Sequence, residues 1–352
     1  MRVRHSSALK ALLIGFGNVG RKVAEILSVE KEQYPNLSSL KVQVVGILTR
    51  SHGSIADVSG IDLKSALAEF KEEGRFLSSN PLVYSSSGVQ AAKELDYDVL
   101  VELSTLSIEG RGEPAVTHVT EALKRRKSVV SANKGPVAFA YQELEELAQK
   151  NSCEFLYEST VMDGAPIFNM ARSSLKGCRI LGVSGILNST TNFILSQLEI
   201  GESFDDALKI AQKEGFAEAD PRHDIEGWDA AAKIAILANV LLKANVTPHE
   251  VKREGIAGLS VKRAQSAVQR GKRLKLLCSA KYEKGFLKAS VGLEEMAGDH
   301  PFARIDPRGS ILKIETDLMS PLFIVQENPG LYDTAYGVIN DLLTSSASIS
   351  IL

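Results

Sequence analysis

The feature that most constrains the fold is an alternation of short apolar runs and amphipathic segments over roughly residues 8–160. The apolar runs, of which Val42–Leu48 is typical, carry few polar residues, and segments with helical spacing of apolar residues follow them. Runs that are apolar throughout indicate strands buried on both faces, as in a parallel sheet covered by helices. The sequence therefore predicts an α/β domain built on a doubly wound parallel sheet.

A glycine motif, GFGNVG at Gly15–Gly20, lies between the first apolar run and the first helical segment. Glycines at this spacing permit a tight turn, let the backbone approach a pyrophosphate, and let the helix pack closely on the strand. The positive end of the helix dipole then faces the phosphates. This context favours a Rossmann-type dinucleotide-binding domain over a turn needed only for packing.

The end of the second predicted strand distinguishes between cofactors. Sites that prefer NAD usually carry an acidic residue there, which binds the 2′-hydroxyl of the adenosine ribose. This sequence instead has Arg50, in LTRS, with no acidic residue beside it. A guanidinium can bind a 2′-phosphate through two parallel hydrogen bonds, so the sequence favours NADP, with NAD as the alternative. An arginine that is merely solvated would carry no such preference.

The pattern changes after about residue 160. Helical segments come first, and four strand-like runs joined by charged turns follow within residues 273–328, which indicates an α+β domain with a sheet of its own. The last helical segment, residues 333–346, has no partner among those hairpins and is expected to rejoin the first domain. We therefore predict a first domain over residues 1–160, completed by residues 330–352, and a second domain over residues 161–329.

The totals exclude several classes of partner. The formal net charge of −2 leaves no basic excess to neutralise nucleic-acid phosphates. The apolar run Ala11–Ile14 is too short for a signal peptide, and no run approaches the roughly 20 apolar residues of a membrane span. Cys153, Cys178 and Cys278 are widely spaced and form neither a disulfide framework nor a zinc-binding pattern. We predict a cytoplasmic protein that binds neither nucleic acid nor membranes.

Two short segments follow predicted strands at the edge where open α/β sheets bind ligands. Ser104 follows the run YDVLVEL, and Lys134 lies in ANKG after the next strand. Lys134 would then point toward the nicotinamide end of a dinucleotide, although a lysine in such a loop is more often only solvated.

The turn YESTVMDGAP, residues 157–166, could coordinate a monovalent cation through backbone carbonyls, or could be a structural turn alone.

Residues 214–237 place six carboxylates before an alanine-rich apolar segment that carries one lysine, Lys233. The six are Glu214, Glu218, Asp220, Asp224, Glu226 and Asp229. Asp229 and Lys233 are four residues apart on one helical face, a pair that contributes only about 0.3–0.5 kcal/mol on a surface. The neighbouring apolar residues indicate a mostly buried helix, however, on which a lysine needs a carboxylate or a ligand. Such a cluster suits a substrate that carries an ammonium group and a carbonyl to be reduced; a solvated acidic face is the alternative.

Five blocks of the sequence together resemble homoserine dehydrogenase: GFGNVG, SANKGPVA, YESTVMDGAP, GILNSTTNFIL and EGFAEADPRHDIEGWDAAAKIAIL, in that order over nearly the whole chain. The resemblance implies an NAD(P)-dependent oxidoreductase that reduces L-aspartate 4-semialdehyde to L-homoserine, in the pathway to threonine, methionine and isoleucine. It also implies a Rossmann-type domain and a second domain that binds substrate and forms a homodimer. The sequence looks like a short form without an aspartate kinase or ACT domain, so threonine feedback is not expected.

The resemblance assigns roles to individual residues. Lys134 and Lys233 match the two active-site lysines of the family, and Glu218, Asp224 and Asp229 match acids that line the homoserine pocket. The cofactor-binding positions, the motif glycines included, are Gly15, Phe16, Gly17, Asn18, Val19, Gly20, Arg50, Ser104, Lys134 and Gly330. The site for sodium or another monovalent cation corresponds to Glu158, Val161, Asp163 and Ala165.

A mechanism and two alternative functions follow from these positions. We expect the acids at 218–229 to form one wall of a pocket for the substrate ammonium, and Asp229 to hold Lys233 in its charged form. A charged Lys233 can then act on the aldehyde oxygen together with Lys134. A related oxidoreductase for another semialdehyde or hydroxy acid stays open, since His223 stands where many family members have an acid. A non-catalytic NADP-binding sensor is also open, although both lysines are present.

Overall fold

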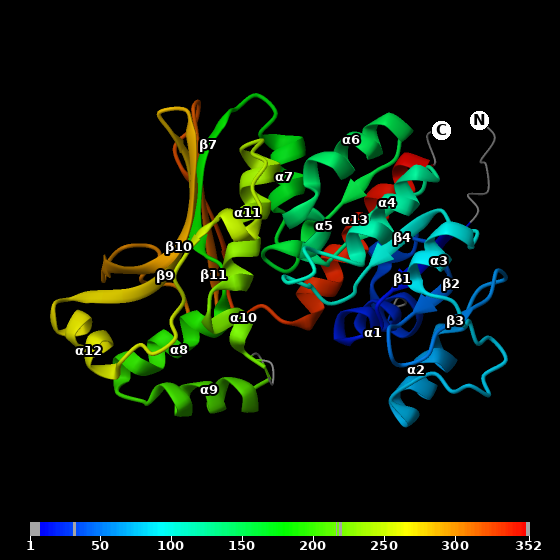
Figure 1. Ribbon diagram of the computed structural model, residues 1–352, viewed down its shortest axis with the longest axis horizontal. Helices are drawn as coiled ribbons and strands as arrows, with labels where there is room; N and C mark the ends of the chain where they lie inside the picture. Colours follow the sequence, from blue (N-terminus) through cyan, green and yellow to red (C-terminus); the bar gives the residue numbers. More distant parts are fainter. Residues whose placement is uncertain (1–7, 31–32, 216, 218–219, 350–352) are drawn as a thin grey trace. The chain divides into compact units, whose positions relative to one another are not determined.

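The computed structural model describes residues 8–30, 33–215, 217 and 220–349. The chain divides into two compact units, and the first is assembled from two segments far apart in the sequence. It comprises the chain up to Gly164 together with the segment from Gly330 onward, whereas Ala165–Pro329 form the second unit. In Figure 1 the two segments of the first unit are coloured from blue to green and in red.

The first unit is built on a six-stranded sheet with the strand order β3-β2-β1-β4-β5-β6. Its strands are β1 (Leu9–Ile14), β2 (Val42–Leu48), β3 (Ile55–Ala56), β4 (Val99–Glu102), β5 (Ser128–Ser131) and β6 (Phe155–Leu156). All except β3 run parallel to one another, which confirms the predicted doubly wound sheet. The edge strand β3 is antiparallel to β2 and is not among the predicted strands, because two residues are too short to show a pattern.

The parallel strands end together at one edge of this sheet. Ile14, the last residue of β1, lies opposite Leu48 of β2 and Glu102 of β4, and Glu102 lies opposite Ser131 of β5. The loops after these four strands therefore begin side by side. This carboxyl edge is where ligands bind in open α/β sheets.

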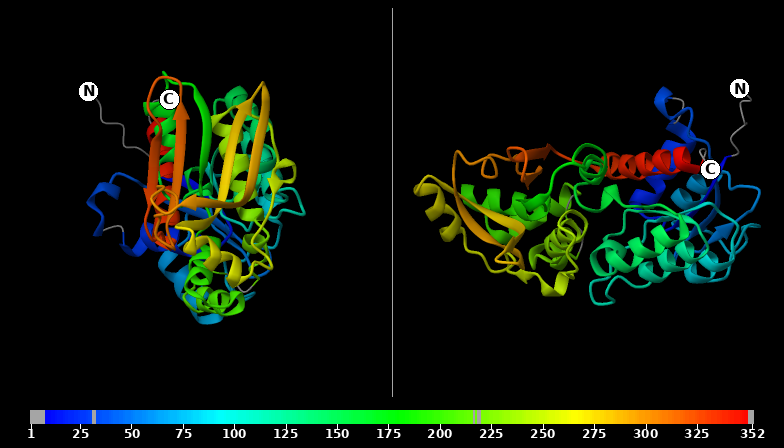
Figure 2. Two further views of the ribbon diagram at one scale, coloured as in Figure 1. Left: turned by 90° about the vertical axis from the view of Figure 1, so that its left-hand side faces the viewer. Right: turned by 90° about the horizontal axis from the view of Figure 1, so that it is seen from above.

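Helices cover both faces of the first sheet (Figure 2). The helical segments are α1 (Asn18–Glu25), the π-helical turn η1 (Ile26–Glu30), the 3-10 turn η3 (Pro35–Leu37), α2 (Leu63–Glu73), α3 (Gly88–Glu94), α4 (Ala115–Lys124), α5 (Lys134–Phe139), α6 (Tyr141–Asn151), the 3-10 turn η4 (Glu158–Thr160) and α13 (Leu331–Ile349). On one face α13 packs beside α1, where Val338 and Ile339 share a hydrophobic core with Val23 and with Leu13 of β1. On the other face α4 packs against α3 and α6.

The second unit has its own six-stranded sheet, with the order β12-β11-β7-β9-β10-β8. Its strands are β7 (Ile180–Ile186), β8 (Lys252–Arg253), β9 (Lys272–Glu283), β10 (Phe286–Ala297), β11 (Ser310–Thr316) and β12 (Leu322–Gln326). Neighbouring strands are antiparallel except for β8, which pairs parallel to β10. The predicted second α+β fold with a separate sheet is therefore confirmed.

Most of the helices of the second unit are amphipathic, but one is buried almost throughout. The helical segments are α7 (Ile167–Ser174), α8 (Ser189–Ile200), α9 (Phe204–Lys213), α10 (Arg222–Ile225), α11 (Trp228–Leu241), the 3-10 turn η5 (Pro248–Glu250) and α12 (Val261–Gln269). Helices α8, α11 and α12 pack against β9. Every residue of α11 from Ala230 to Leu241 is buried except Lys233, so this lysine lies on a mostly buried helix as predicted.

The three cysteines are free thiols. Cys278 is buried, which raises the pKa of its thiol to about 12, and burial also raises the pKa of the half-buried Cys153. Cys178 is half-buried too. Within the part of the chain that the structure describes, no helix has the length and apolar character needed to span a lipid bilayer.

Candidate functional site

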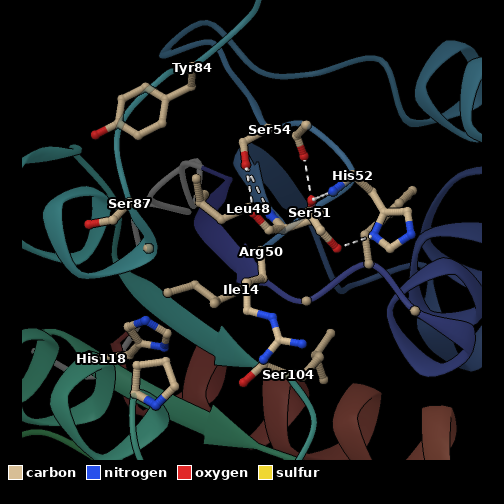
Figure 3. Close-up of a pocket in the computed structure, with 18 of the residues that line it drawn as sticks. Ile14, Leu48, Arg50, Ser51, His52, Ser54, Tyr84, Ser87, Ser104 and His118 are labelled. Carbon is tan, nitrogen blue, oxygen red and sulfur yellow. Dashed lines mark hydrogen bonds between the residues drawn. The ribbon is translucent and has the colours of Figure 1, made fainter. Parts of the chain in front are cut away.

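A pocket of about 930 Å³ lies at the carboxyl edge of the first sheet. The loops after β1, β2 and β4 line it, together with residues 84–89 and the start of α4. Figure 3 shows Arg50 in the middle of the pocket, with Ser87 and His118 on one side and Ser51 and His52 on the other. Three of the predicted cofactor-binding segments therefore meet in one cavity of the first unit.

The glycine loop has the geometry that a pyrophosphate-binding turn requires. Gly15 has φ +108°, and a Cβ atom there would lie 2.5 Å from the carbonyl carbon of Leu103. A Cβ on Gly20 would lie 2.5 Å from the Gly15 carbonyl oxygen, so both positions admit only glycine. A Cβ on Gly17 would meet nothing within 4 Å, and no side chain caps the helix α1 that begins after it. The N–H groups at the start of α1 are thus open to an anion, and the loop fits a dinucleotide.

Three other predicted residues of this loop have side chains that are buried or already hydrogen-bonded. The ring of Phe16 is buried, with its centroid 5.2 Å from that of Phe70 and 5.5 Å from that of Phe76. Val19 packs against the same core, and the Asn18 side-chain oxygen accepts a hydrogen bond from Arg21 at 2.7 Å. Phe16 and Val19 would therefore contribute backbone atoms to cofactor binding.

The turn after β2 holds Arg50 at its exposed tip. The Thr49 hydroxyl donates to the Gly53 carbonyl at 2.6 Å and accepts from the His52 N–H at 2.8 Å. The Thr49 N–H in turn donates to the Ser54 hydroxyl at 3.0 Å. Among the described residues that line the pocket, none is acidic, whereas two are arginines. This charge distribution suits a phosphate better than a bare ribose hydroxyl.

The loop after β4 is fixed by a buried carboxylate that sequence reasoning missed. Glu102 is fully buried, and it accepts a hydrogen bond from the Ser104 N–H at 2.8 Å and another from the Ser104 hydroxyl. Asn133 donates to the Ser104 hydroxyl at 3.1 Å, while its side-chain oxygen accepts from the Gly135 N–H at 2.8 Å and caps α5. Lys134 is the first residue of α5, so one network positions both Ser104 and the start of the lysine-bearing helix.

Gly330 lies at the beginning of α13 in the same unit. Its N–H donates to the Asp333 carboxylate at 2.8 Å. The next residue, Leu331, lines a smaller hollow of about 470 Å³ together with Asn18 and Lys22 of α1. The structure thus brings two predicted cofactor-binding segments, around Gly330 and Asn18, close together, outside the larger pocket.

In the second unit, Lys233 and Asp229 form the ion pair that their spacing predicts. The Lys233 ammonium lies 3.1 Å from the Asp229 carboxylate, and the two side chains are only 16% and 15% exposed. The same ammonium donates to the Leu187 carbonyl oxygen at 2.7 Å. An opposite charge and a carbonyl acceptor both favour the ammonium form of a partly buried lysine.

Asn188 joins this cluster and is the second residue that sequence reasoning missed. Its side-chain amide donates to Asp224 at 2.7 Å and to Asp229 at 2.9 Å. Its side-chain oxygen accepts from the Thr191 N–H at 2.8 Å and so caps α8. One asparagine therefore holds both the Asp224 carboxylate and the Asp229 carboxylate that pairs with Lys233. In sequence it looks like a helix cap and nothing else.

The acids expected to form one wall of a substrate pocket at 218–229 have different partners where the structure describes them. Asp220 is exposed and pairs with Arg222, which lowers the pKa of its carboxyl to about 2. Glu226 accepts from the Trp228 ring N–H at 3.2 Å. Of the acids that the structure describes in this segment, Asp229 pairs with Lys233, and Asp224 is linked to Asp229 through Asn188. Glu218 lies outside the described residues, and the exposed His223 precedes Asp224 on α10.

The predicted cation-binding residues do not all belong to the same compact unit: Glu158, Val161 and Asp163 lie in the first unit and Ala165 in the second. Glu158 is buried, and its N–H donates to the Asp341 carboxylate at 2.9 Å; Val161 is also buried. Asp163 accepts a hydrogen bond from the Thr334 hydroxyl at 2.7 Å, so its carboxylate helps to hold α13. Ala165 is the first residue of the second unit. The described residues hold no group of three or more metal-ligating side chains, and carbonyl coordination stays a prediction.

Comparisons with known proteins agree with this arrangement. The family model for homoserine dehydrogenase matches residues 166–343, and the model for its NAD binding domain matches residues 15–158. The homoserine dehydrogenase of Methanocaldococcus jannaschii is 37% identical over 333 residues, which cover 94% of this chain and 97% of that relative. The NAD(+)-dependent homoserine dehydrogenase of Pseudomonas canavaninivorans is 33% identical, with 95% of each chain covered.

Solved structures give the same result. A hyperthermophilic archaeal homoserine dehydrogenase in complex with NADPH is 29% identical and superposes with a TM-score of 0.81, covering 97% of this chain and 98% of that one. The homoserine dehydrogenase model and the model of its NAD binding domain thus both match this one chain. The chain therefore belongs to the homoserine dehydrogenase family and is an NAD(P)-dependent oxidoreductase.

Proposed function

We propose that the protein reduces L-aspartate 4-semialdehyde to L-homoserine, reversibly and with a preference for NADPH, in the biosynthesis of threonine, methionine and isoleucine. The observation that carries the proposal is the cluster of Lys233, Asp229, Asp224 and Asn188. It combines a held ammonium group with two oriented carboxylates. Those are the charges that a substrate with a reactive carbonyl and an ammonium group would need.

In this proposal the two lysines act on the carbonyl oxygen. A nicotinamide cofactor, when held by the glycine loop, Arg50 and Ser104, would supply a hydride for the aldehyde carbon. The Lys233 ammonium, kept charged by Asp229, stabilises the negative charge that develops on the oxygen and supplies or relays a proton to it. Lys134, at the carboxyl edge of the first sheet, is proposed as the second cation. Asp224 and Glu218 bind the substrate ammonium, Glu218 on the strength of the resemblance alone.

The preference for NADPH rests on the pocket of the first unit. Arg50 lies in the middle of a cavity whose described lining includes no acidic residue. Ser104 and the backbone of the glycine loop would hold the rest of the cofactor. The two cofactors are both represented among similar proteins, one being named NAD(+)-dependent and another being solved with NADPH. The distinction must therefore come from this chain's own residues.

Substrate analogues test the proposed substrate. The purified protein should oxidise L-homoserine with NADP⁺, and 4-hydroxybutyrate, which has the same alcohol but no ammonium group, should be oxidised at least about a hundredfold less efficiently. Losing a hydrogen-bonded charge pair costs several kcal/mol, enough for such a factor. A second panel of other semialdehydes with NADPH covers the alternative substrates. Equal efficiency with the analogue, or a better semialdehyde, would point to a different substrate.

Asn188 offers a prediction about the carboxylates. Serine also caps helices well but cannot donate to two carboxylates at once, so Asn188→Ser should lower kcat/KM for L-homoserine about ten- to a hundredfold. Asn188→Asp keeps the cap but places a third carboxylate beside Asp224 and Asp229, and should be worse. NADPH binding, measured by fluorescence titration, should not change in either variant. Near-normal kcat/KM in both would mean that Asn188 is only a cap.

The monovalent cation is a separate proposal. The Glu158 carboxylate and the carbonyls near Val161 and Asp163 are hard-oxygen donors of the kind that sodium and potassium prefer. Activity at constant ionic strength should therefore depend on the identity of the monovalent cation. Assays in sodium, potassium and tetramethylammonium chloride measure this. The same rate in all three salts would leave the segment as a structural turn.

We also propose that the protein is a cytoplasmic homodimer. β12 is an edge strand of the second sheet without a charged residue, and Phe323 and Val325 are 44% and 49% exposed on it. Exposed apolar edge strands are prone to pair with another chain. The proposed cytoplasmic location rests on the cysteines, because free thiols fit a reducing compartment. Light scattering should give a dimer mass that Phe323→Lys reduces; a monomer for the unaltered protein would contradict the proposal.

A further inference from the structure

A buried glutamate–histidine pair lies at the cofactor pocket, where His118 is part of the lining and Glu102 is behind it, and the proposed reaction does not use the pair. The Nδ1 atom of His118, in the first turn of α4, lies 2.7 Å from the Glu102 Oε2 atom, and both side chains are almost completely buried. Charged or polar groups are rarely buried in this way without a partner or a task. The Oε1 atom of Glu102 is already engaged by Ser104, which leaves Oε2 for the histidine.

The second ring nitrogen of His118, Nε2, lies beside Gly88, and both residues line the pocket. Within the described residues, no hydrogen-bond partner of Nε2 is found, although His118 lines the cavity. Gly88 lies against it, and a Cβ atom at that position would come within 2.9 Å of Nε2. Any larger residue at position 88 would therefore crowd the nitrogen. A nearly buried histidine thus presents one polar atom to the cavity.

The Glu102 carboxylate determines the chemistry of that atom. A carboxylate can only accept hydrogen bonds, so a neutral imidazole beside it carries its proton on Nδ1. The Nε2 atom of such a ring is then a hydrogen-bond acceptor. The side of the pocket near Ser87 and Gly88 accordingly favours a ligand that has an N–H group at this place.

The location indicates which part of the cofactor would lie there, given the proposed NADP(H) binding. The glycine loop would hold the pyrophosphate, and Arg50 would mark the adenosine ribose. His118 and Ser87 lie on the side of Arg50 away from His52 (Figure 3). The cavity on this side is available for the base attached to that ribose.

We propose that the Glu102–His118 pair recognises the adenine base, with His118 Nε2 accepting a hydrogen bond from its exocyclic amino group. A hypoxanthine base carries a carbonyl oxygen at the same position. His118 Nε2 and that carbonyl oxygen would then be two hydrogen-bond acceptors with no hydrogen between them, so the site would bind hypoxanthine more weakly. His118 is thus a specificity-determining residue for the cofactor, and Glu102 is the positioning residue that sets its tautomer.

Direct binding tests this proposal without any turnover. The fluorescence of NADPH and of its deamino analogue, which has hypoxanthine in place of adenine, is titrated with the purified protein. The unaltered protein should bind NADPH about ten- to a hundredfold more tightly than the analogue, the range expected for one lost hydrogen bond with an unsatisfied acceptor. His118→Leu should bind both with the same, weaker affinity.

Glu102→Gln gives the sharper result. The glutamine oxygen can still accept from Ser104, while its amide donates to Nδ1 of His118 and moves the ring proton to Nε2. Nε2 then becomes a donor, so this variant should prefer the deamino analogue. His52→Ala, which removes a histidine from the opposite side of the same pocket, should leave the ratio of the two affinities unchanged.

The outcomes separate this inference from the proposed function. Unaltered protein that binds neither nucleotide would refute NADP(H) binding itself. Tight NADPH binding with no discrimination against the analogue would overturn only the role of His118. Discrimination that persists in both His118→Leu and Glu102→Gln would overturn it as well. Should His118→Leu fail to fold, the unaltered protein and Glu102→Gln still decide the matter.

Discussion

Replacing Lys233 with methionine is expected to lower kcat at least about a hundredfold, the low end for the loss of a general acid, while NADPH affinity stays near that of the unaltered protein. Methionine keeps the apolar stem within α11 but removes the ammonium group that Asp229 and the Leu187 carbonyl hold. The proposed reaction needs that charge at the carbonyl oxygen, where a fixed cation contributes most to the rate. Steady-state kinetics and a fluorescence titration with NADPH measure the two quantities.

Lys209→Met is the matched control. Lys209 also pairs with an acid on its own helix, Asp206, but its side chain is 73% exposed. Its replacement should change neither kcat nor the unfolding temperature appreciably, since exposed pairs contribute little. Suppose that Lys233→Met instead keeps near-normal turnover and only unfolds at a lower temperature. Lys233 would then be a structural partner of Asp229, and the proposed mechanism would be wrong.

Replacing Arg50 with alanine is expected to weaken NADPH binding by about 1–3 kcal/mol, the range for a lost charge-assisted hydrogen-bonded pair. NADH has no 2′-phosphate, so its binding should hardly change, and it serves as the internal control. Titrations of each variant with both cofactors at one ionic strength give the comparison. Equal losses for NADPH and NADH would show that Arg50 does not distinguish them.

Patterns that extend over a whole strand or helix turn predicted the fold well. β2 has the bounds Val42–Leu48 that its apolar run indicates, because a central parallel strand is buried on both faces and tolerates few polar residues. The two-residue strands β3 and β8 are too short for any such pattern. The glycine motif predicted the turn at Gly15 and Gly20, where an added Cβ atom would come within 2.5 Å of backbone atoms.

The candidate site was predictable where the chemistry lies within one helix. Asp229 and Lys233 are one turn apart, so their pairing follows from local geometry alone. Asn188 comes from a different helix and meets Asp224 and Asp229 only through tertiary packing. Nothing in its sequence context distinguishes it from an ordinary cap. Likewise, six neighbouring acids look alike in sequence, but a separate partner, Arg222, draws Asp220 away.

The same limit applies to the cofactor pocket. In the sequence, Glu102 is the last residue of an apolar strand and His118 is a polar residue of an amphipathic helix. Their contact joins β4 to α4, so neither segment alone indicates it. The sequence therefore identified the glycine loop, but not the Glu102–His118 pair, which forms only through tertiary packing. Phe16 shows the opposite case: it belongs to the glycine motif that the sequence identified, but its ring packs in the core.

The most direct test of the account is the rate of NADPH oxidation with L-aspartate 4-semialdehyde, measured beside a reaction without the aldehyde and beside Lys233→Met. We expect rapid oxidation that requires the aldehyde, yields L-homoserine in a one-to-one ratio with the NADPH consumed, and falls at least about a hundredfold in the variant. No oxidation above the aldehyde-free control, from folded protein that binds NADPH, would contradict the account.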